Sequence, residues 1–383
     1  MKFDFSKPIN RRNEGSEKWN CPEGVLPMWV ADMDFEVAPC IQKTMQERIS
    51  HPCYGYTAFP KEWALSYVHF FEKHFHVSLK SESLCFSLGV IPSLSCVIRA
   101  FSNPGDEVVL LSPVYNIFDH SAENSYRKII RSPLREENGV YSIDWGNLES
   151  CLLRKKAKIM VLCNPHNPVG KVWSKEELSQ IASLASKHNV LVISDEVHGP
   201  INGGEKAYTP YFSVSEEARL NSISLFAPTK AFNIAGVMTS SCYCENPEIC
   251  SKLAFSLNAD ELAEGNFLSY PVVISAFEQG DDWLREMNEY VHRNYLYCLS
   301  FLKEHLPQAV ISPMEATYLL WVDLSKLIQD DVAFCEDLKK KTGLWITPGS
   351  TYGPEGKGHV RINLATQRSR VEEGMKRLVS YFK

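Results

Sequence analysis

Several features that would place this chain in a special class of proteins are missing from its 383 residues. No apolar run approaches the roughly 18 residues that a membrane-spanning helix needs, and the first residues lack the apolar core of a signal peptide. No block rich in lysine and arginine occurs, and the net charge is −6, which disfavours binding to nucleic acid or to an anionic membrane. We therefore expect a cytoplasmic protein that acts on a small molecule.

The twelve cysteines lack the spacing of a metal site or of a disulfide framework. Only Cys242 and Cys244 lie close together, and their C-x-C spacing has no second pair, whereas zinc sites commonly use C-x-x-C pairs. Most of the others lie in apolar runs, where a free thiol acts as a small hydrophobic side chain. We expect reduced thiols and no metal.

What is present is the alternation of a parallel α/β fold. Four short apolar runs follow one another, at residues 107–111, 158–163, 190–194 and 222–226. Runs that are apolar on both faces suit a parallel sheet covered by helices. Between the second and third run, Ser174 and Glu177 form a capping box that opens a helix over residues 174–189. Strand, helix and strand in about 40 residues make a βαβ unit.

The last hundred residues have a different pattern. Residues 281–305 read as one long helix, and residues 317–323 and 358–363 read as strands. A chain of this length is also too long for one small core. We predict a large α/β domain over residues 40–280 and a smaller α+β domain built from residues 1–39 and 281–383.

Each central strand of the large domain is followed by polar residues at its carboxyl end. Tyr115, Asn167, Asp195 and Lys230 come after the four predicted strands in turn. Open α/β sheets bind ligands in the crevice outside these strand ends, so we expect the four side chains to share one pocket. Lys230 stands in a mostly small and apolar stretch. Because burying a cation is costly, its amine is expected to be neutral and nucleophilic.

A candidate anion site precedes the first strand. The segment Ser-Leu-Gly-Val-Ile-Pro-Ser, residues 87–93, runs into a helical pattern over residues 94–101. A glycine turn into a helix, with Pro92 near its first turn, offers unpaired N–H groups to a phosphate. The stretch is neither a Walker A loop nor G-x-G-x-x-G. A phosphate site, a stacking tyrosine, a carboxylate and a nucleophilic lysine together fit pyridoxal 5′-phosphate (PLP).

Three ordered motifs strengthen this interpretation. Asn-Pro-His-Asn-Pro-Val-Gly (164–170), Ser-Asp-Glu-Val-His (194–198) and Ala-Pro-Thr-Lys-Ala-Phe-Asn-Ile-Ala-Gly (227–236) resemble the fold-type-I, aminotransferase-like PLP enzymes. Leu-Pro-Met-Trp-Val-Ala-Asp-Met-Asp-Phe (26–35) and Tyr-Gly-Tyr-Thr (54–57) are similar to the MalY/PatB-type C–S lyases, which include cystathionine β-lyases and cystalysin. The resemblance covers nearly the whole chain.

The resemblance implies a role for each strand-end residue. Lys230 would bond the cofactor's aldehyde carbon and later move the substrate Cα proton. Asp195 would pair with the ring nitrogen and keep it protonated, and Tyr115 would stack on the ring. Asn167 would hydrogen-bond the ring hydroxyl oxygen and also face the substrate.

The resemblance also implies the phosphate contacts and the assembly. Gly89, Val90 and Ile91 would contribute backbone groups at the phosphate, together with the Thr229 hydroxyl. Tyr56 resembles a tyrosine that reaches the phosphate of the neighbouring subunit, which implies a homodimer with shared active sites.

The substrate side of the pocket follows from the same resemblance. Arg361 would grip the substrate carboxylate by a two-pronged contact. Ala31, in the motif of residues 26–35, would also contact the substrate. His198 would form part of the cofactor pocket without a chemical role.

The chain departs from the family pattern at two phosphate positions. Many aminotransferases have a serine three residues before the lysine and an arginine eight residues after it, whereas this chain has Ala227 and Met238. We therefore expect phosphate binding to depend more on the helix N-terminus, Thr229 and Tyr56.

The predicted activity is that of a PLP-dependent C–S β-lyase. Its substrate would be cystathionine or a related cysteine thioether or disulfide, cleaved by α,β-elimination to pyruvate, ammonia and a thiol. An aminotransferase of the same fold, or a lyase with an additional regulatory binding role, remains an alternative.

Overall fold

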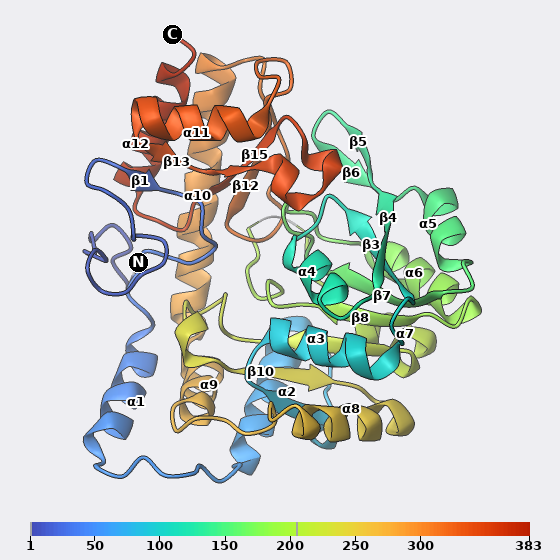
Figure 1. Cartoon of the computed structure of the whole chain (residues 1–383). Helices are drawn as coiled ribbons and strands as arrows, with labels where there is room; N and C mark the ends of the chain where they lie inside the picture. Colours follow the sequence, from blue (N-terminus) through green and yellow to red (C-terminus); the bar gives the residue numbers. More distant parts are fainter. Residues whose placement is uncertain (1, 204–205) are drawn as a thin grey trace.

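The computed structural model describes residues 2–203 and 206–383, and its centre is a seven-stranded sheet of order β2-β10-β9-β8-β7-β3-β4 (Figure 1). The strands are β2 (Leu84–Ser87), β3 (Glu107–Ser112), β4 (Lys128–Pro133), β7 (Ala157–Cys163), β8 (Leu191–Asp195), β9 (Ser222–Phe226) and β10 (Ser240–Tyr243). β10 is antiparallel to both of its neighbours, and the strands from β9 to β4 are parallel. The four predicted strands are confirmed to within a residue or two.

Helices cover both faces of this sheet because its strands are buried on both sides. One face packs on α3 (Val90–Phe101), α4 (Ile117–Glu123) and α8 (Pro247–Ala259). The other packs on α5 (Trp145–Leu152), α6 (Lys175–Lys187) and α7 (Glu216–Leu220). The predicted capping box is present at the start of α6, where Ser174 accepts from the Glu177 N–H.

α3 is longer than the sequence pattern indicated. The helix begins at Val90 rather than at residue 94, with Gly89 as its N-cap. Pro92 therefore lies inside the first turn, where its missing N–H costs no hydrogen bond and its fixed φ suits the helix. The N–H groups at the start of α3 therefore lie directly after Gly89.

A second, four-stranded antiparallel sheet of order β11-β12-β15-β14 lies in the carboxyl-terminal part of the chain. Its strands are β11 (Val310–Ile311), β12 (Leu319–Asp323), β14 (Thr347–Pro348) and β15 (His359–Asn363). The helices near it are α10 (Asp281–His305), α11 (Asp331–Thr342) and α12 (Arg368–Ser380). α10 has the predicted bounds. β12 begins two residues later than predicted, because Thr317 has a φ of +69° that no strand accommodates.

The amino-terminal segment joins the carboxyl-terminal elements. β1 (Leu26–Pro27) pairs in parallel with β13 (Leu344–Trp345), and Figure 1 shows the blue N-terminal segment beside the red C-terminal helices. The remaining elements are α1 (Pro39–Ser50), α2 (Lys61–Phe75), α9 (Ser269–Gln279) and the hairpin of β5 (Arg135–Glu137) and β6 (Val140–Ser142). Among the described residues, no helix combines the length and the apolar character that crossing a bilayer requires.

Candidate active site

A cavity of about 300 Å³ lies at the carboxyl ends of β7, β8 and β9. Most of the predicted site residues line this cavity, although they are far apart in the sequence. Its lining includes Ala31, Gly89, Val90, Ile91, Tyr115, Asn167, Asp195, His198, Thr229 and Lys230. The predicted convergence at the strand ends is therefore present, as expected for an open α/β sheet.

The amine of Lys230 is held by a backbone carbonyl. Its Nζ donates to the Ala31 carbonyl oxygen at 2.7 Å, and the Tyr318 hydroxyl donates to the same oxygen at 2.9 Å. Burial lowers the pKa of Lys230 to about 8, and the positive charge of Arg361 acts in the same direction. Near neutral pH the buried amine is thus much closer to its nucleophilic, neutral form than a surface lysine is.

Asp195 is a buried carboxylate without a cationic partner. Its Oδ1 accepts from the Val197 N–H at 3.2 Å. Within the described part of the chain, no cationic side chain lies within ion-pair distance of it, and burial raises its pKa to about 6. A buried carboxylate is costly unless a charge or hydrogen bonds compensate it. The N–H of a protonated ring would provide that compensation.

Arg361 lies on β15 and reaches the cavity through Asn167. Its Nη1 donates to Asn167 Oδ1 at 3.2 Å, and its Nη2 donates to the Trp29 carbonyl at 3.1 Å. The guanidinium carbon also lies 4.7 Å from the centre of the Tyr352 ring. These contacts fix the plane of the guanidinium, while its buried Nε has no hydrogen-bond partner.

Two aromatic side chains complete the walls of the cavity. Burial raises the pKa of Tyr115, so its hydroxyl stays protonated at neutral pH. Burial, together with the nearby charges of Lys230 and Arg361, lowers the pKa of His198 to about 3. A neutral His198, whose ring meets Tyr318 edge-on at 5.9 Å, suits a wall residue rather than a proton donor.

Tyr56 does not line the cavity of its own chain. Its side chain is fully exposed, in the segment between α1 and α2. Its side chain does not reach the cavity of its own subunit, and its predicted role across a dimer interface stays a prediction.

Two residues that bring a hydroxyl group to the site were not found by sequence reasoning. Tyr318 shares the Ala31 carbonyl with Lys230, and Thr239 lines the cavity with a buried hydroxyl that has no hydrogen-bond partner. Neither residue stands in a motif or directly after a central strand, so the pattern that found the other residues gave no signal for them.

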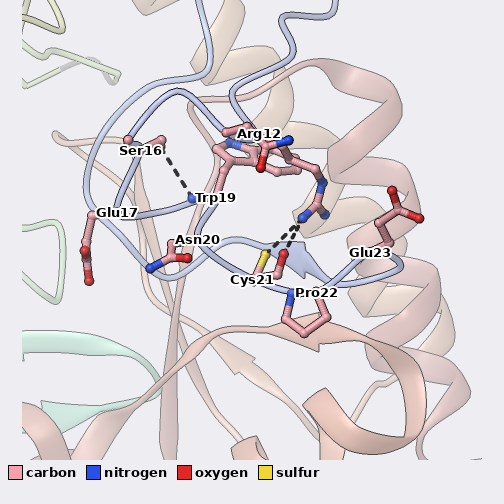
Figure 2. A pocket seen from close by; sticks show the side chains of 10 residues that line it. Arg12, Ser16, Glu17, Trp19, Asn20, Cys21, Pro22 and Glu23 are labelled. Atoms are coloured by element: carbon pink, nitrogen blue, oxygen red, sulfur yellow. Dashed lines mark hydrogen bonds between the residues drawn. The ribbon is translucent and has the colours of Figure 1, made fainter.

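A larger hollow of about 530 Å³ lies on the amino-terminal segment (Figure 2). The Arg12 guanidinium donates to the carbonyls of Cys21 and Val25. The backbone N–H of Trp19 donates to the Ser16 hydroxyl (Figure 2). The carboxylates of this hollow, Glu17 and Glu23, are exposed, and none of its described lining residues is a buried nucleophile. The buried amine and the buried carboxylate lie instead in the smaller cavity around Lys230.

The residues of that cavity fit PLP. An amine of lowered pKa suits an aldehyde, and the carboxylate of Asp195 suits a protonated ring nitrogen. The N-terminus of α3 has no acidic residue in its first turn and no side-chain cap, which leaves its N–H groups for a phosphate. The unpartnered hydroxyl of Thr239 provides one more polar group in the same cavity.

The mostly parallel sheet, the strand-end cavity and its lysine define a PLP-dependent enzyme of fold type I. The chain belongs to the aminotransferase class I and II family, whose model matches residues 24–378. The resemblance and the fold predicted from the sequence are thereby confirmed.

Individual relatives extend over the whole chain. Cystathionine beta-lyase PatB of Bacillus subtilis is 33% identical over 98% of this chain and 99% of its own length. A PLP-bound putative aminotransferase from Clostridium difficile is 35% identical, with a TM-score of 0.96 and full coverage of both chains. Cystalysin from Treponema denticola, whose structure contains PLP, is 30% identical, with a TM-score of 0.96 over 99% of this chain and 98% of its own.

Proposed function

We propose that this protein is a PLP-dependent C–S β-lyase that cleaves cystathionine or a related cysteine thioether to pyruvate, ammonia and a thiol. The observation that carries the proposal is the meeting of Lys230 and the unpaired carboxylate of Asp195 in one cavity. The similarity over full length to a cystathionine β-lyase and to cystalysin supports the choice of reaction.

The chain's own residues would hold the cofactor at both ends. Lys230 would bond its aldehyde carbon, Asp195 would face its ring nitrogen, and Tyr115 would cover the ring. Asn167 would donate through its amide to the ring oxygen. When bound, PLP supplies an electron sink that stabilises negative charge at the substrate Cα.

The proton transfer is assigned to Lys230. The Lys230 amine would accept the substrate Cα proton at Nζ, since its neutral form is a base. The Ala31 carbonyl is positioned to hold that amine, and Tyr318 keeps the carbonyl in place through its own hydrogen bond. Because the base is already held near the reacting bond, the reaction does not lose the entropy needed to bring the two together from solution.

Substrate orientation is assigned to Arg361. The bonds to Asn167 and to the Trp29 carbonyl fix its guanidinium plane, which suits two-pronged binding of a carboxylate. Because His198 is neutral, it adds no second positive charge that would hold the carboxylate elsewhere.

The active unit is proposed to be a homodimer in the cytoplasm. Three aromatic side chains, Tyr54, Tyr56 and Phe59, are exposed by 49% or more in the segment between α1 and α2. Such a concentration of exposed aromatic surface is typical of an interaction site. Tyr56 would enter the partner subunit's cavity near the phosphate. Each subunit would consist of the large domain of residues 40–280 and the small domain of residues 1–39 and 281–383.

An aminotransferase is the second candidate, because the family includes such enzymes and one relative of 35% identity is a putative aminotransferase. The two activities separate in one assay. Purified protein with L-cystathionine and no keto acid should release pyruvate and a thiol in equal amounts. No release of pyruvate or thiol, together with conversion of an added keto acid such as 2-oxoglutarate to its amino acid, would establish the aminotransferase instead.

A second experiment tests the assigned lysine. Borohydride reduction should attach the cofactor to Lys230, as seen by peptide mass analysis. Lys230→Ala should remove both the attachment and the activity, whereas Lys187→Ala, at an exposed ion pair with Glu149, should change neither. Cofactor found on another lysine would refute the assignment.

A further inference from the structure

Thr239 has a buried hydroxyl that nothing in the chain satisfies. Its side chain is fully buried, and its Oγ1 has no hydrogen-bond partner. Buried hydroxyl groups are hydrogen-bonded in most native structures, so an unpaired one calls for a partner from outside the chain. Because Thr239 also lines the cavity around Lys230, the missing partner can be a ligand of that cavity.

The strand register places Thr239 at one particular end of the cavity. β10 is antiparallel to β2, and Ser240 is the partner of Ser87. The Ser240 hydroxyl also donates to the Ser87 carbonyl at 3.1 Å, which holds this register. One step further along the pair, Thr239 comes opposite Leu88, the residue before the N-cap Gly89 of α3. Thr239 therefore lies beside the N-terminus of α3.

That helix end is suited to an anion and is short of side-chain donors. Its first-turn N–H groups have no acceptor within the helix, and the first turn holds no acidic residue. Pro92 has no N–H to offer. Met238, which also lines the cavity next to Thr239, adds no donor, since a methionine side chain carries no N–H or O–H group.

We propose that the Thr239 hydroxyl donates a hydrogen bond to the phosphate of the bound cofactor, together with the N–H groups at the start of α3. This rests on the proposed function, since it takes PLP as the ligand. The hydroxyl supplies a donor beside Met238, which supplies none, and the phosphate in turn satisfies a buried group that is otherwise unpaired.

The test compares two ligands on the cofactor-free protein. Equilibrium binding of PLP and of pyridoxal, which lacks the phosphate, is measured by the quenching of protein fluorescence. Thr239→Val, which keeps the shape and removes the hydroxyl, should weaken PLP binding by about 10- to 150-fold, the range of one hydrogen bond to a charged group. Its binding of pyridoxal should stay within about twofold. Thr239→Ser should retain tight PLP binding.

The control is Ser241→Ala, which removes another buried hydroxyl two residues further on, outside the cavity lining. It should leave both ligands unaffected. Thermal unfolding adds a second readout. Because Thr239→Val removes an unpaired group, the cofactor-free protein should be as stable as the parent or more so, while the stabilisation by added PLP should shrink.

Three results would overturn the assignment: unchanged PLP binding in Thr239→Val, equal weakening of PLP and pyridoxal, or a lower melting temperature of the cofactor-free variant. If Thr239→Val does not fold, Thr239→Ala provides the same comparison. Failure of the parent protein to bind PLP at all would refute the proposed function itself, and Thr239 would lose its ligand with it.

Discussion

Replacing Asp195 by asparagine is the sharpest single test of the site. The asparagine keeps the size of the side chain and an oxygen to accept from the Val197 N–H, so the change removes little besides the negative charge. The carboxylate is buried, and burial raises its pKa to about 6 although the charge of Lys230 acts in the opposite direction. Its proposed partner is the protonated ring nitrogen of PLP.

The size of the effect follows from the loss of a buried ionic partner. Removing one member of a buried pair typically costs about 3–5 kcal/mol. The pairing is needed most when negative charge from the substrate Cα enters the ring, so the loss should fall on kcat. Since about 1.36 kcal/mol corresponds to a factor of ten in rate, the expected decrease is about 150- to 5,000-fold.

The assay is pyruvate release from L-cystathionine in saturating PLP, with cofactor content confirmed by absorbance. The matched control is Glu196→Gln, the neighbouring buried carboxyl, which is outside the cavity lining and is bonded by Tyr208 and the Tyr211 N–H. We expect the control to retain most of its turnover. A kcat of Asp195→Asn within about threefold of the parent would show that Asp195 does not face the ring nitrogen.

Three further predictions concern other parts of the site. Burial and the charge of Arg361 lower the pKa of Lys230 to about 8. The rate at which the cofactor-free protein bonds PLP should therefore rise about tenfold per pH unit below pH 8 and level off above it. A rate, followed by absorbance, that does not vary with pH would contradict this. Arg361→Lys should lower kcat/KM by tenfold or more, about the value of a two-pronged contact, and the parent should discriminate against amino acid amides, so equal rates on amide and acid would exclude the carboxylate role. The Tyr56→Phe and Lys230→Ala proteins, each impaired alone, should regain activity when they are mixed and exchange subunits, since a mixed dimer holds one intact site. If mass spectrometry verifies the exchange and activity does not rise, Tyr56 does not act across the interface.

The sequence predicted the parts of the fold that depend on neighbouring residues. The apolar runs of β3, β7, β8 and β9 and the capping box of α6 are local patterns, and the structure has them nearly where they were expected. The apolar pattern predicts a start of α3 at residue 94, which is four residues too late. Pro92 is accepted in the first turn of a helix, so the helix begins at Val90 with Gly89 as its N-cap.

The sequence by itself also determined that Tyr115, Asn167, Asp195 and Lys230 share one cavity, because the carboxyl ends of parallel strands share one edge of a sheet. Only the tertiary structure decided how they are held. The Lys230 contact with Ala31 joins residues 199 positions apart, and the Arg361 contact with Asn167 joins residues 194 apart. The hydroxyl of Thr239 is buried without a partner, and the pairing of β10 with β2 places it beside the start of α3. Such contacts depend on register and packing between distant segments, and no local pattern of side chains encodes them.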